Sequence, residues 1–256
     1  MVKNKSIGAV VVFYKTSQKQ KKSIVAQLNK IVNKNMIVCI DTTKNNFGFA
    51  HGVNKGIQKL LKHKTDIIIV ANPDIHLFNI TRAKLFETAK HFAIFGFPFR
   101  ENTNIFYAGV IDPWNMSGGF TQKQERKIYK KTDFVSGSFM CIQRNVINKI
   151  GIFDTRYFMY YEDVEYCLRA RKSGFSIGIR TDSIYEHAGS ATKNKEYYLI
   201  RNRLLTLFRY GTVIQKLHEI AALPKHCTIN TNNIALKLRA VKDFLHIYLF
   251  NKYVQY

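Results

Sequence analysis

Paired cysteines are missing from this chain. Its cysteines, Cys39, Cys141, Cys167 and Cys227, are far apart and form no CxxC pair. This spacing argues against a zinc site and against a disulfide framework. Because Cys39, Cys141 and Cys167 each lie in an apolar run, we expect small, buried hydrophobic side chains at these positions.

A long hydrophobic segment is also missing near the N-terminus. The apolar run IGAVVVFY covers only residues 7–14, which is too short to cross a bilayer, and no small-residue cleavage site follows it. We therefore expect a protein that is cytoplasmic and not secreted.

Two common phosphate-binding motifs are absent. No GxGxxG follows the first apolar run, and GxxxxGK[ST] does not occur. These absences disfavour a dinucleotide site of the Rossmann type and a P-loop. A nucleotide site in this chain must be built from other residues.

Acidic residues are scarce. Forty Lys and Arg against seventeen Asp and Glu give a formal net charge of +23. This excess favours an anionic partner such as a phosphorylated substrate, an acidic membrane or nucleic acid. The basic residues are spread along the chain without an arginine-rich arm or an RNP-like motif, so a nucleic-acid-binding module rests on charge alone. It remains the alternative of a different class.

Apolar runs and helical patterns alternate in the first part of the chain. We expect strands at 7–13, 36–40 and 66–71, and helices at 21–32 and 50–61. Strands with few polar residues, joined by helices, predict an α/β fold with a parallel sheet covered on both faces. Ligands of such sheets bind beyond the carboxyl ends of the strands.

Polar residues follow the predicted strands at those ends. Asp41 is placed to accept hydrogen bonds from a base or ribose, although an Asp that forms a turn is the commoner case. In NFGFAHGVNKGI, the glycines at 48, 52 and 56 share one helix face and allow close approach of a backbone or ligand. Asn54 lies among them with an amide that can donate and accept.

The third strand is followed by Asn72-Pro73-Asp74. This sequence is a generic turn, but it presents Asp74 at a strand end, where Mg²⁺ or Mn²⁺ could be held by one carboxylate and substrate phosphates. His187 ends the short predicted strand SIYEH and is a candidate second ligand, although a lone histidine is usually structural.

Glu162 and Asp163 lie in the first turn of a predicted helix that ends near Ser173-Gly174. Carboxylates at this position are favoured by the helix dipole, so the pair could be an ordinary acidic N-terminus. A carboxylate pair can also hold a catalytic base.

The order of these motifs resembles the inverting nucleotide-sugar glycosyltransferases of family 2, and most closely their bacterial rhamnosyltransferase branch, which builds O-antigen and capsular polysaccharides. The resemblance covers about residues 6 to 215 and runs through VVFY, NFGFAHGVNKGI, NPD, VSGSFMCIQR, IGIFDTRYFMYYEDVEYCLR, YEH and YYLIRNRL. It implies a GT-A fold with a mostly parallel central sheet and flanking helices in residues 1–192. A C-terminal helical extension would cover residues 193–256.

The same resemblance implies roles for particular residues. Asp163 matches the general base, with Glu162 beside it, and Asp74 and His187 match ligands of a divalent metal, Mg²⁺ or Mn²⁺. The nucleotide would be contacted by Asp41, Gly48, Asn54 and Asn72. Two residues depart from the family pattern: Asn72 replaces the first acid of the DXD motif, and Glu165 stands where the family often has Asp.

The implied activity is transfer of a sugar from a nucleoside-diphosphate donor to a glycan acceptor linked to polyprenyl diphosphate. Rhamnose from dTDP-rhamnose is the first choice, with galactofuranose or glucose from UDP as the alternative, and no nucleic-acid partner is expected. Residues 193–256 carry eleven Lys and Arg against three acids, interleaved with apolar residues. This pattern suits peripheral attachment at the inner face of the cytoplasmic membrane, and the helices could instead form homodimer contacts.

Overall fold

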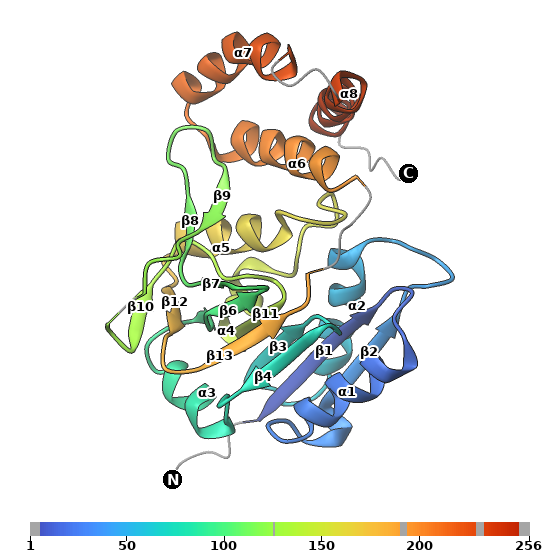
Figure 1. Cartoon of the computed structure of the whole chain (residues 1–256), viewed down its shortest axis with the longest axis vertical. Coiled ribbons are helices and arrows are strands. Elements are labelled where there is room, and N and C mark those ends of the chain that lie inside the picture. The colour runs from blue at the N-terminus through green and yellow to red at the C-terminus, as the bar shows by residue number, and fades with distance from the viewer. Residues whose placement is uncertain (1–5, 125, 190–193, 229–232, 251–256) are drawn as a thin grey trace.

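The computed structural model describes residues 6–124, 126–189, 194–228 and 233–250 (Figure 1). The last six residues of the predicted extension lie outside this range. The strands are β1 (Ile7–Phe13), β2 (Ile37–Asp41), β3 (Ile67–Ala71), β4 (Ile75–Phe78), β5 (Ile94–Gly96), β6 (Phe99–Glu101), β7 (Asn104–Phe106), β8 (Gly109–Ile111), β9 (Gly118–Phe120), β10 (Tyr129–Lys131), β11 (Phe139–Gln143), β12 (Ile177–Arg180) and β13 (Ile184–His187). The helices are α1 (Gln18–Leu28), α2 (Phe49–Leu61), α3 (Arg82–Thr88), α4 (Arg144–Ile150), α5 (Glu162–Lys172), α6 (Lys195–Tyr210), α7 (Val213–Thr228) and α8 (Ile234–Phe250), with a 3-10 turn at Lys34–Met36.

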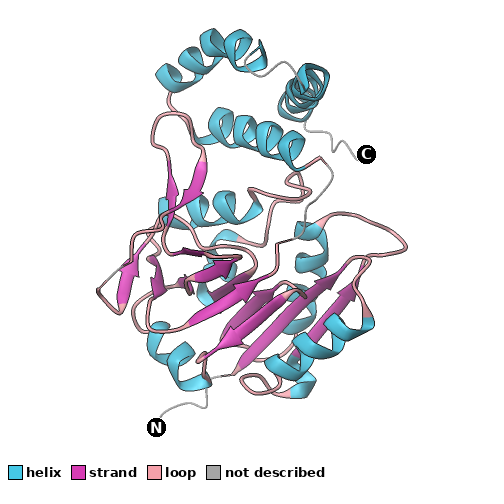
Figure 2. Cartoon of the chain, in the orientation of Figure 1, coloured by secondary structure: helices cyan, strands magenta, loops and turns pink. Residues whose placement is uncertain are grey.

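The central sheet has seven strands in the order β10-β12-β5-β11-β3-β1-β2 (Figure 2). β1 pairs in parallel with β2 and β3, as the sequence predicts. β11 then runs antiparallel to both β3 and β5, so the complete sheet is mixed. Because Phe139 at the start of β11 pairs with Ala71 at the end of β3, the segment before β11 lies at the carboxyl edge of the parallel strands.

The central strands are apolar on both faces because each face packs against a separate core. In β1, Val10 and Val12 belong to one core, whereas Ala9 and Val11 belong to the other. The first core also contains side chains of α2, α4, α5 and α6. The second contains side chains of α1, α3 and a small sheet with the strand order β4-β13-β6-β7. This alternation explains why β1 and β3 read as continuous hydrophobic runs.

Two expectations at the N-terminal end of the sheet are wrong. The first helix begins at Gln18 rather than at residue 21, because Ser17 and Gln20 form a capping box that starts the helix early. Cys39 is exposed rather than buried, since β2 is the edge strand of the sheet. Cys141 and Cys167 are buried, as expected.

Helices α6, α7 and α8 stack beyond the sheet at the end of the molecule opposite the N-terminus (Figure 1). Leu204 of α6 and Phe244 of α8 lie in the same core as the sheet. The division of the chain at residue 192 therefore stays a prediction, and the packing joins α6 closely to the sheet. In the described part of the chain, no helix is both long and apolar enough to cross a membrane.

Candidate active site

The carboxyl edge of the sheet gathers the polar residues that the sequence singles out. Strands β2, β1 and β3 are adjacent and parallel, so Asp41, the last residue of β2, and Asn72, the residue after β3, lie at one edge. Neighbouring strands lie about 4.8 Å apart, which separates the ends of β2 and β3 by about 10 Å. An edge of this width suits a ligand of nucleotide size.

Asn72, Asp74 and His187 form a candidate metal-binding group at the end of β3, called the metal-binding group below. The Nε2 atom of His187 lies 3.5 Å from Oδ1 of Asp74 and 3.3 Å from the side-chain amide nitrogen of Asn72. Burial opposes the ionisation of Asp74, but the hydrogen bond and charge of His187 outweigh it and lower the pKa of that carboxyl. The register of β13 against β4 pairs His187 with Ile75, which places the histidine beside the NPD turn.

This donor set fits a divalent cation that also binds substrate phosphates. One carboxylate and one imidazole leave most positions of an octahedral ion open, as Mg²⁺ and Mn²⁺ sites on nucleotides require. Among the described residues, no cluster of three or more His, Cys, Asp or Glu side chains could enclose a metal by itself. A cation here would therefore depend on phosphate oxygens for most of its ligands.

The acidic pair begins α5. Asp163 accepts hydrogen bonds from the backbone amides of Gly137, at 2.9 Å, and Val164, at 2.8 Å. Glu162 is buried, and within the described chain its Oε2 atom has no hydrogen-bond partner. Burial raises the pKa of both carboxyls, and the charge of Asp163 raises that of Glu162 further. Of the two, Asp163 accepts backbone hydrogen bonds that stabilise a carboxylate, whereas burial and the charge of Asp163 both raise the pKa of Glu162.

The segment before β11 connects the acidic pair to the metal-binding group. Gly137 donates to Asp163, and the next residue, Ser138, accepts a hydrogen bond from the backbone amide of Asn72 at 2.9 Å. The Ser138 hydroxyl also bonds the buried Tyr185 hydroxyl at 2.7 Å, two residues before His187. The VSGS motif thus fixes the two halves of the site relative to each other, a role that the sequence did not reveal.

A strained turn directly precedes the acidic pair Glu162 and Asp163. Tyr160 and Tyr161 both have left-handed backbones, with φ of 64° and 68°, a conformation that is costly for large side chains. The buried side-chain amide of Asn202 in α6 donates to the carbonyl groups of Met159 and Tyr160 at 2.9 and 2.7 Å. Helix α6 therefore holds the turn from which Glu162 and Asp163 project. Apart from the motif YYLIRNRL, nothing in the sequence indicates this role.

Glu165 takes part in a structural network. Its side chain is fully buried and accepts from Arg169 at 3.0 Å and from the Tyr210 hydroxyl at 2.5 Å. These bonds tie the Glu165 carboxylate to α5 and to the last residue of α6, so it is held within the protein. The extra length of Glu relative to the family's usual Asp is used to reach these partners.

Asp41 lies at the end of β2, two strands away from the metal-binding group at the end of β3. It is exposed, forms an ion pair with Lys21 at 2.6 Å and accepts from the amide of Thr43 at 2.9 Å. The hydrogen bonds of Lys21 and Thr43 lower its pKa to about 2. The carboxylate is ionised across the physiological range and oriented by its neighbours.

Gly48 and Asn54 bind other parts of the protein. Gly48 has φ of +88°, and a Cβ atom there would lie 2.5 Å from the carbonyl oxygen of Phe158. The buried Asn54 amide donates to the carbonyl of Phe153 at 2.8 Å and accepts from its amide at 3.0 Å. Both residues thus fix the chain that leads to the acidic pair, and their contact with a nucleotide stays a prediction.

The mixed seven-stranded sheet, with helices on both faces, has the GT-A fold. The crystal structure of GalNAc-T7 with UDP, GalNAc and Mn²⁺ shares this fold, with a TM-score of 0.62 at 12% sequence identity over 94% of this chain and 54% of that one. Residues 1–204 match the family model described as Glycosyltransferase like family 2. The chain belongs to that family.

The chain is similar to curated relatives at modest identity. It is 26% identical over 177 residues to the low-salt glycan biosynthesis hexosyltransferase Agl10 of Haloferax volcanii, covering 62% of this chain and 57% of the relative. It is 26% identical over 147 residues to the rhamnosyltransferase WbbL of Escherichia coli, covering 50% of this chain and 56% of the relative. It is also 29% identical over 82 residues to the N-acetylglucosaminyl-diphospho-decaprenol L-rhamnosyltransferase of Mycobacterium tuberculosis, covering 32% of this chain and 26% of the relative. The matches to Agl10 and WbbL therefore span little more than half the length of those relatives.

Proposed function

We propose that this chain is an inverting glycosyltransferase that moves a sugar from a nucleoside-diphosphate donor to a lipid-linked glycan. The observation that carries the proposal is the Gly137-Ser138 segment, which joins a buried carboxylate pair to a group of metal-binding chemistry. A nucleotide sugar already has a good leaving group, so the enzyme must stabilise charge on the diphosphate and remove a proton from an acceptor hydroxyl. The two halves of the site match these two needs.

Asp163 is the proposed base. Its two backbone hydrogen bonds stabilise the carboxylate, while burial raises its pKa toward the range in which a carboxylate accepts a proton effectively. Attack by the deprotonated hydroxyl on the side of the sugar opposite the leaving diphosphate inverts the anomeric carbon.

Glu162 is proposed to bind the same acceptor. Its unpartnered Oε2 is buried beside the base, and a protonated carboxyl can donate a hydrogen bond to a sugar oxygen. A substrate hydroxyl would satisfy an atom that is costly to leave unpaired.

Asp74 and His187 are proposed to hold Mg²⁺ or Mn²⁺, which would supply positive charge to the diphosphate when bound. Asn72 adds an amide at the same place. Asp41 is proposed to bind the nucleoside from the edge at β2. Gly48 and Asn54 would act by positioning the chain around Phe153 and Phe158, and any contact of theirs with the nucleotide is part of the same proposal.

Rhamnose from dTDP-rhamnose is the preferred donor because two of the relatives are rhamnosyltransferases. A UDP-dependent transfer of galactofuranose or glucose is the alternative. A glycan linked to polyprenyl diphosphate is the preferred acceptor, since the mycobacterial relative is named for a diphospho-decaprenol substrate. Such a substrate would place the enzyme at the inner face of the cytoplasmic membrane, in O-antigen or capsular polysaccharide synthesis.

Thermal unfolding with a panel of nucleotide sugars tests the donor, because a ligand that binds the folded state raises the melting temperature. dTDP-rhamnose with Mn²⁺ should give the largest shift and should be hydrolysed slowly to dTDP. A larger shift with a UDP-sugar would select the alternative donor. Tight, salt-sensitive DNA binding without turnover of any donor would instead support a nucleic-acid-binding module.

A further inference from the structure

Exposed apolar side chains are concentrated on α7 and α8. Among the described residues, these two helices carry nine of the large apolar side chains that are exposed, four on α7 and five on α8, against six in the rest of the chain. Val213 and Leu249 are 70% and 66% exposed. The nine exposed apolar residues of the two helices are Val213, Ile214, Leu217, Ile220, Leu238, Leu245, Tyr248, Leu249 and Phe250. A concentration of this kind marks an interaction surface rather than chance exposure.

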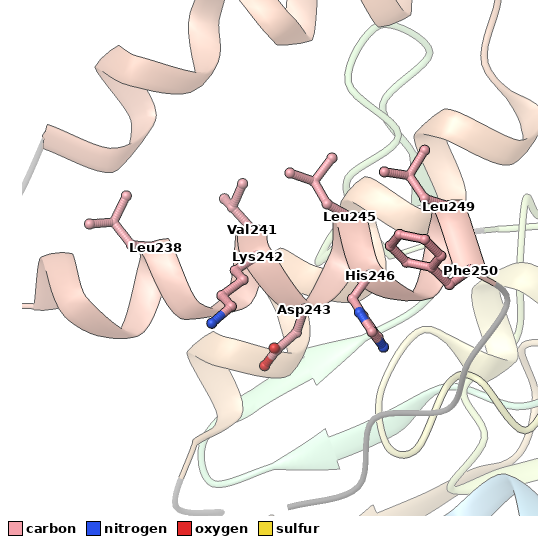
Figure 3. A pocket seen from close by; sticks show the side chains of 8 residues that line it. All are labelled: Leu238, Val241, Lys242, Asp243, Leu245, His246, Leu249 and Phe250. Atoms are coloured by element: carbon pink, nitrogen blue, oxygen red, sulfur yellow. The ribbon is translucent and has the colours of Figure 1, made fainter.

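Helix α8 is apolar on two sides. Its inner side, with Phe244 and Ile247, packs into the core of the molecule. Leu238, Val241, Leu245 and Leu249 point to another side, where they line an open groove (Figure 3). The inner side accounts for the folding of the helix, and the outer side needs another partner.

The exposed charge on the two helices is positive. Their two acids are buried: Glu219 forms an ion pair with Arg203 at 2.5 Å, and Asp243 accepts from the Tyr197 hydroxyl at 2.6 Å. Lys225 and Lys242 are exposed. The nine exposed apolar side chains, together with Lys225 and Lys242, are called the outer surface of α7 and α8 below. This surface combines apolar side chains with positive charge, and the described residues of the two helices expose no carboxylate.

We propose that the outer surface of α7 and α8 docks on an anionic lipid bilayer. Apolar side chains flanked by lysine are the composition of helices that lie in the headgroup region, where basic residues are attracted to anionic lipids. A second copy of this chain would bring the same positive charge to the interface, whereas anionic headgroups oppose it with negative charge. Charge complementarity thus selects the bilayer over a homodimer.

The β8–β9 hairpin connects this surface to the acidic pair. At its tip, the Trp114 indole donates to His218 of α7 at 3.1 Å, and the carbonyl of Asn115 accepts from Arg203 at 2.9 Å. Just beyond the tip, at the first residue of β9, the amide of Gly118 donates to the hydroxyl of Tyr161, the residue before Glu162, at 3.0 Å. A docked bilayer would thus lie on the acceptor side of the site; this consequence rests on the proposed function, whereas the docking itself does not.

Vesicle sedimentation of the full chain tests the proposal without any activity measurement. The chain should bind vesicles of phosphatidylcholine and phosphatidylglycerol, bind pure phosphatidylcholine at least tenfold more weakly, and lose affinity as salt rises. The paired variants Leu217→Glu with Ile220→Glu, and Leu245→Glu with Leu249→Glu, should each weaken binding at least tenfold. The matched control is Phe78→Glu with Ile128→Glu, which adds the same charge at exposed apolar positions elsewhere and should change binding less than twofold.

Circular dichroism and thermal unfolding check the fold of each variant, and serine pairs at the same positions replace any glutamate pair that lowers the melting temperature. Equal weakening by the control pair would overturn the proposal, because the effect would then come from net charge alone. Light scattering tests whether a second copy of the chain occupies this surface instead of a bilayer. A dimer that the α8 pair dissociates, in a chain that does not bind the anionic vesicles, would assign this surface to a second copy.

Discussion

The side-chain amide of Asn202 donates to the carbonyl of Tyr160 at 2.7 Å, across 42 residues of sequence. This bond, with its partner to Met159, holds a left-handed turn that the tyrosines would not adopt at low cost. The position of the acidic pair therefore depends on a residue of α6 with no acid-base chemistry of its own.

The variant Asn202→Ala tests this dependence. It removes the two hydrogen bonds to the turn, which leaves two carbonyl groups unpaired, and also the bond that Asn202 accepts from Arg201, so the free energy of unfolding should fall by about 2 to 4 kcal/mol. We expect kcat to fall more than donor affinity, because the turn positions Glu162 and Asp163 and not the metal-binding group. Unfolding by urea and donor titration separate the two effects, and a loss of stability with unchanged kcat would contradict the positioning role.

The variant Asp163→Asn tests the base. Asparagine keeps the shape of the side chain but cannot accept the proton, so kcat should fall about a hundredfold or more. The dissociation constant of the donor, measured by calorimetry, should stay within about threefold. Near-normal turnover would remove Asp163 from the role of base.

The metal-binding group is tested by Asp74→Ala and His187→Ala. Each should weaken donor binding about tenfold or more, and a chelator that weakens binding to the wild type should add little in either variant, because the same interaction is already lost. His76→Ala, at an exposed position on the neighbouring strand β4, is the matched control and should leave the chelator response intact. Full donor binding by the wild type in excess chelator would exclude the metal.

The raised pKa of Glu162 predicts a pH dependence of stability. A buried carboxyl that keeps its proton in the folded state, while the unfolded chain releases it, makes folding less favourable as pH rises above the unfolded value of about 4.3. Glu162→Gln should therefore be more stable than the wild type at neutral pH, and the difference should shrink toward zero below about pH 4. Urea unfolding across this range measures it, and a gain that persists at low pH would point to packing instead of ionisation.

Gly48 and Gly151 form a matched pair for backbone strain. Both have similar backbones, with φ of 88° and ψ of 165° at Gly48 and φ of 78° and ψ of −163° at Gly151, but a Cβ atom would clash with Phe158 only at Gly48. Alanine at Gly151 should cost about 1 to 3 kcal/mol from the backbone alone, and alanine at Gly48 should cost more. Gly119→Ala meets no atom within 4 Å and is the neutral control. Equal costs at positions 48 and 151 would show that the contact with Phe158 is easily relieved.

The sequence predicted the strands and motifs well where the signal is local. The first three strands follow from their apolar runs, and the start of α5 at Glu162 follows from helical spacing and its acidic first turn. The residues of the capping box, Ser17 and Gln20, are also visible in the sequence, but the apolar spacing that predicts the helix begins later.

The remaining relations depend on contacts between distant parts of the chain. The antiparallel insertion of β11 beside β3 cannot be read from either strand, since β3 is apolar throughout and β11 is apolar up to its last residue, Gln143. The bond between Asn202 and the turn before α5 leaves no periodic trace. Asn54 illustrates the limit of residue chemistry, because its amide suits a ligand and a buried backbone equally well, and here it binds the backbone of Phe153.

The buried carboxylate of Glu165 sets a lower limit on the length of a working fragment. Its hydroxyl partner Tyr210 lies at the last position of α6, and Arg209 approaches to 4.0 Å. A fragment cut at residue 192, or at the end of the family match at residue 204, would leave this carboxylate in the interior without either group. The ion pair with Arg169 would remain, but the buried carboxylate would lose a hydrogen bond and a nearby cation. Excision of a stable catalytic unit should therefore include the whole of α6.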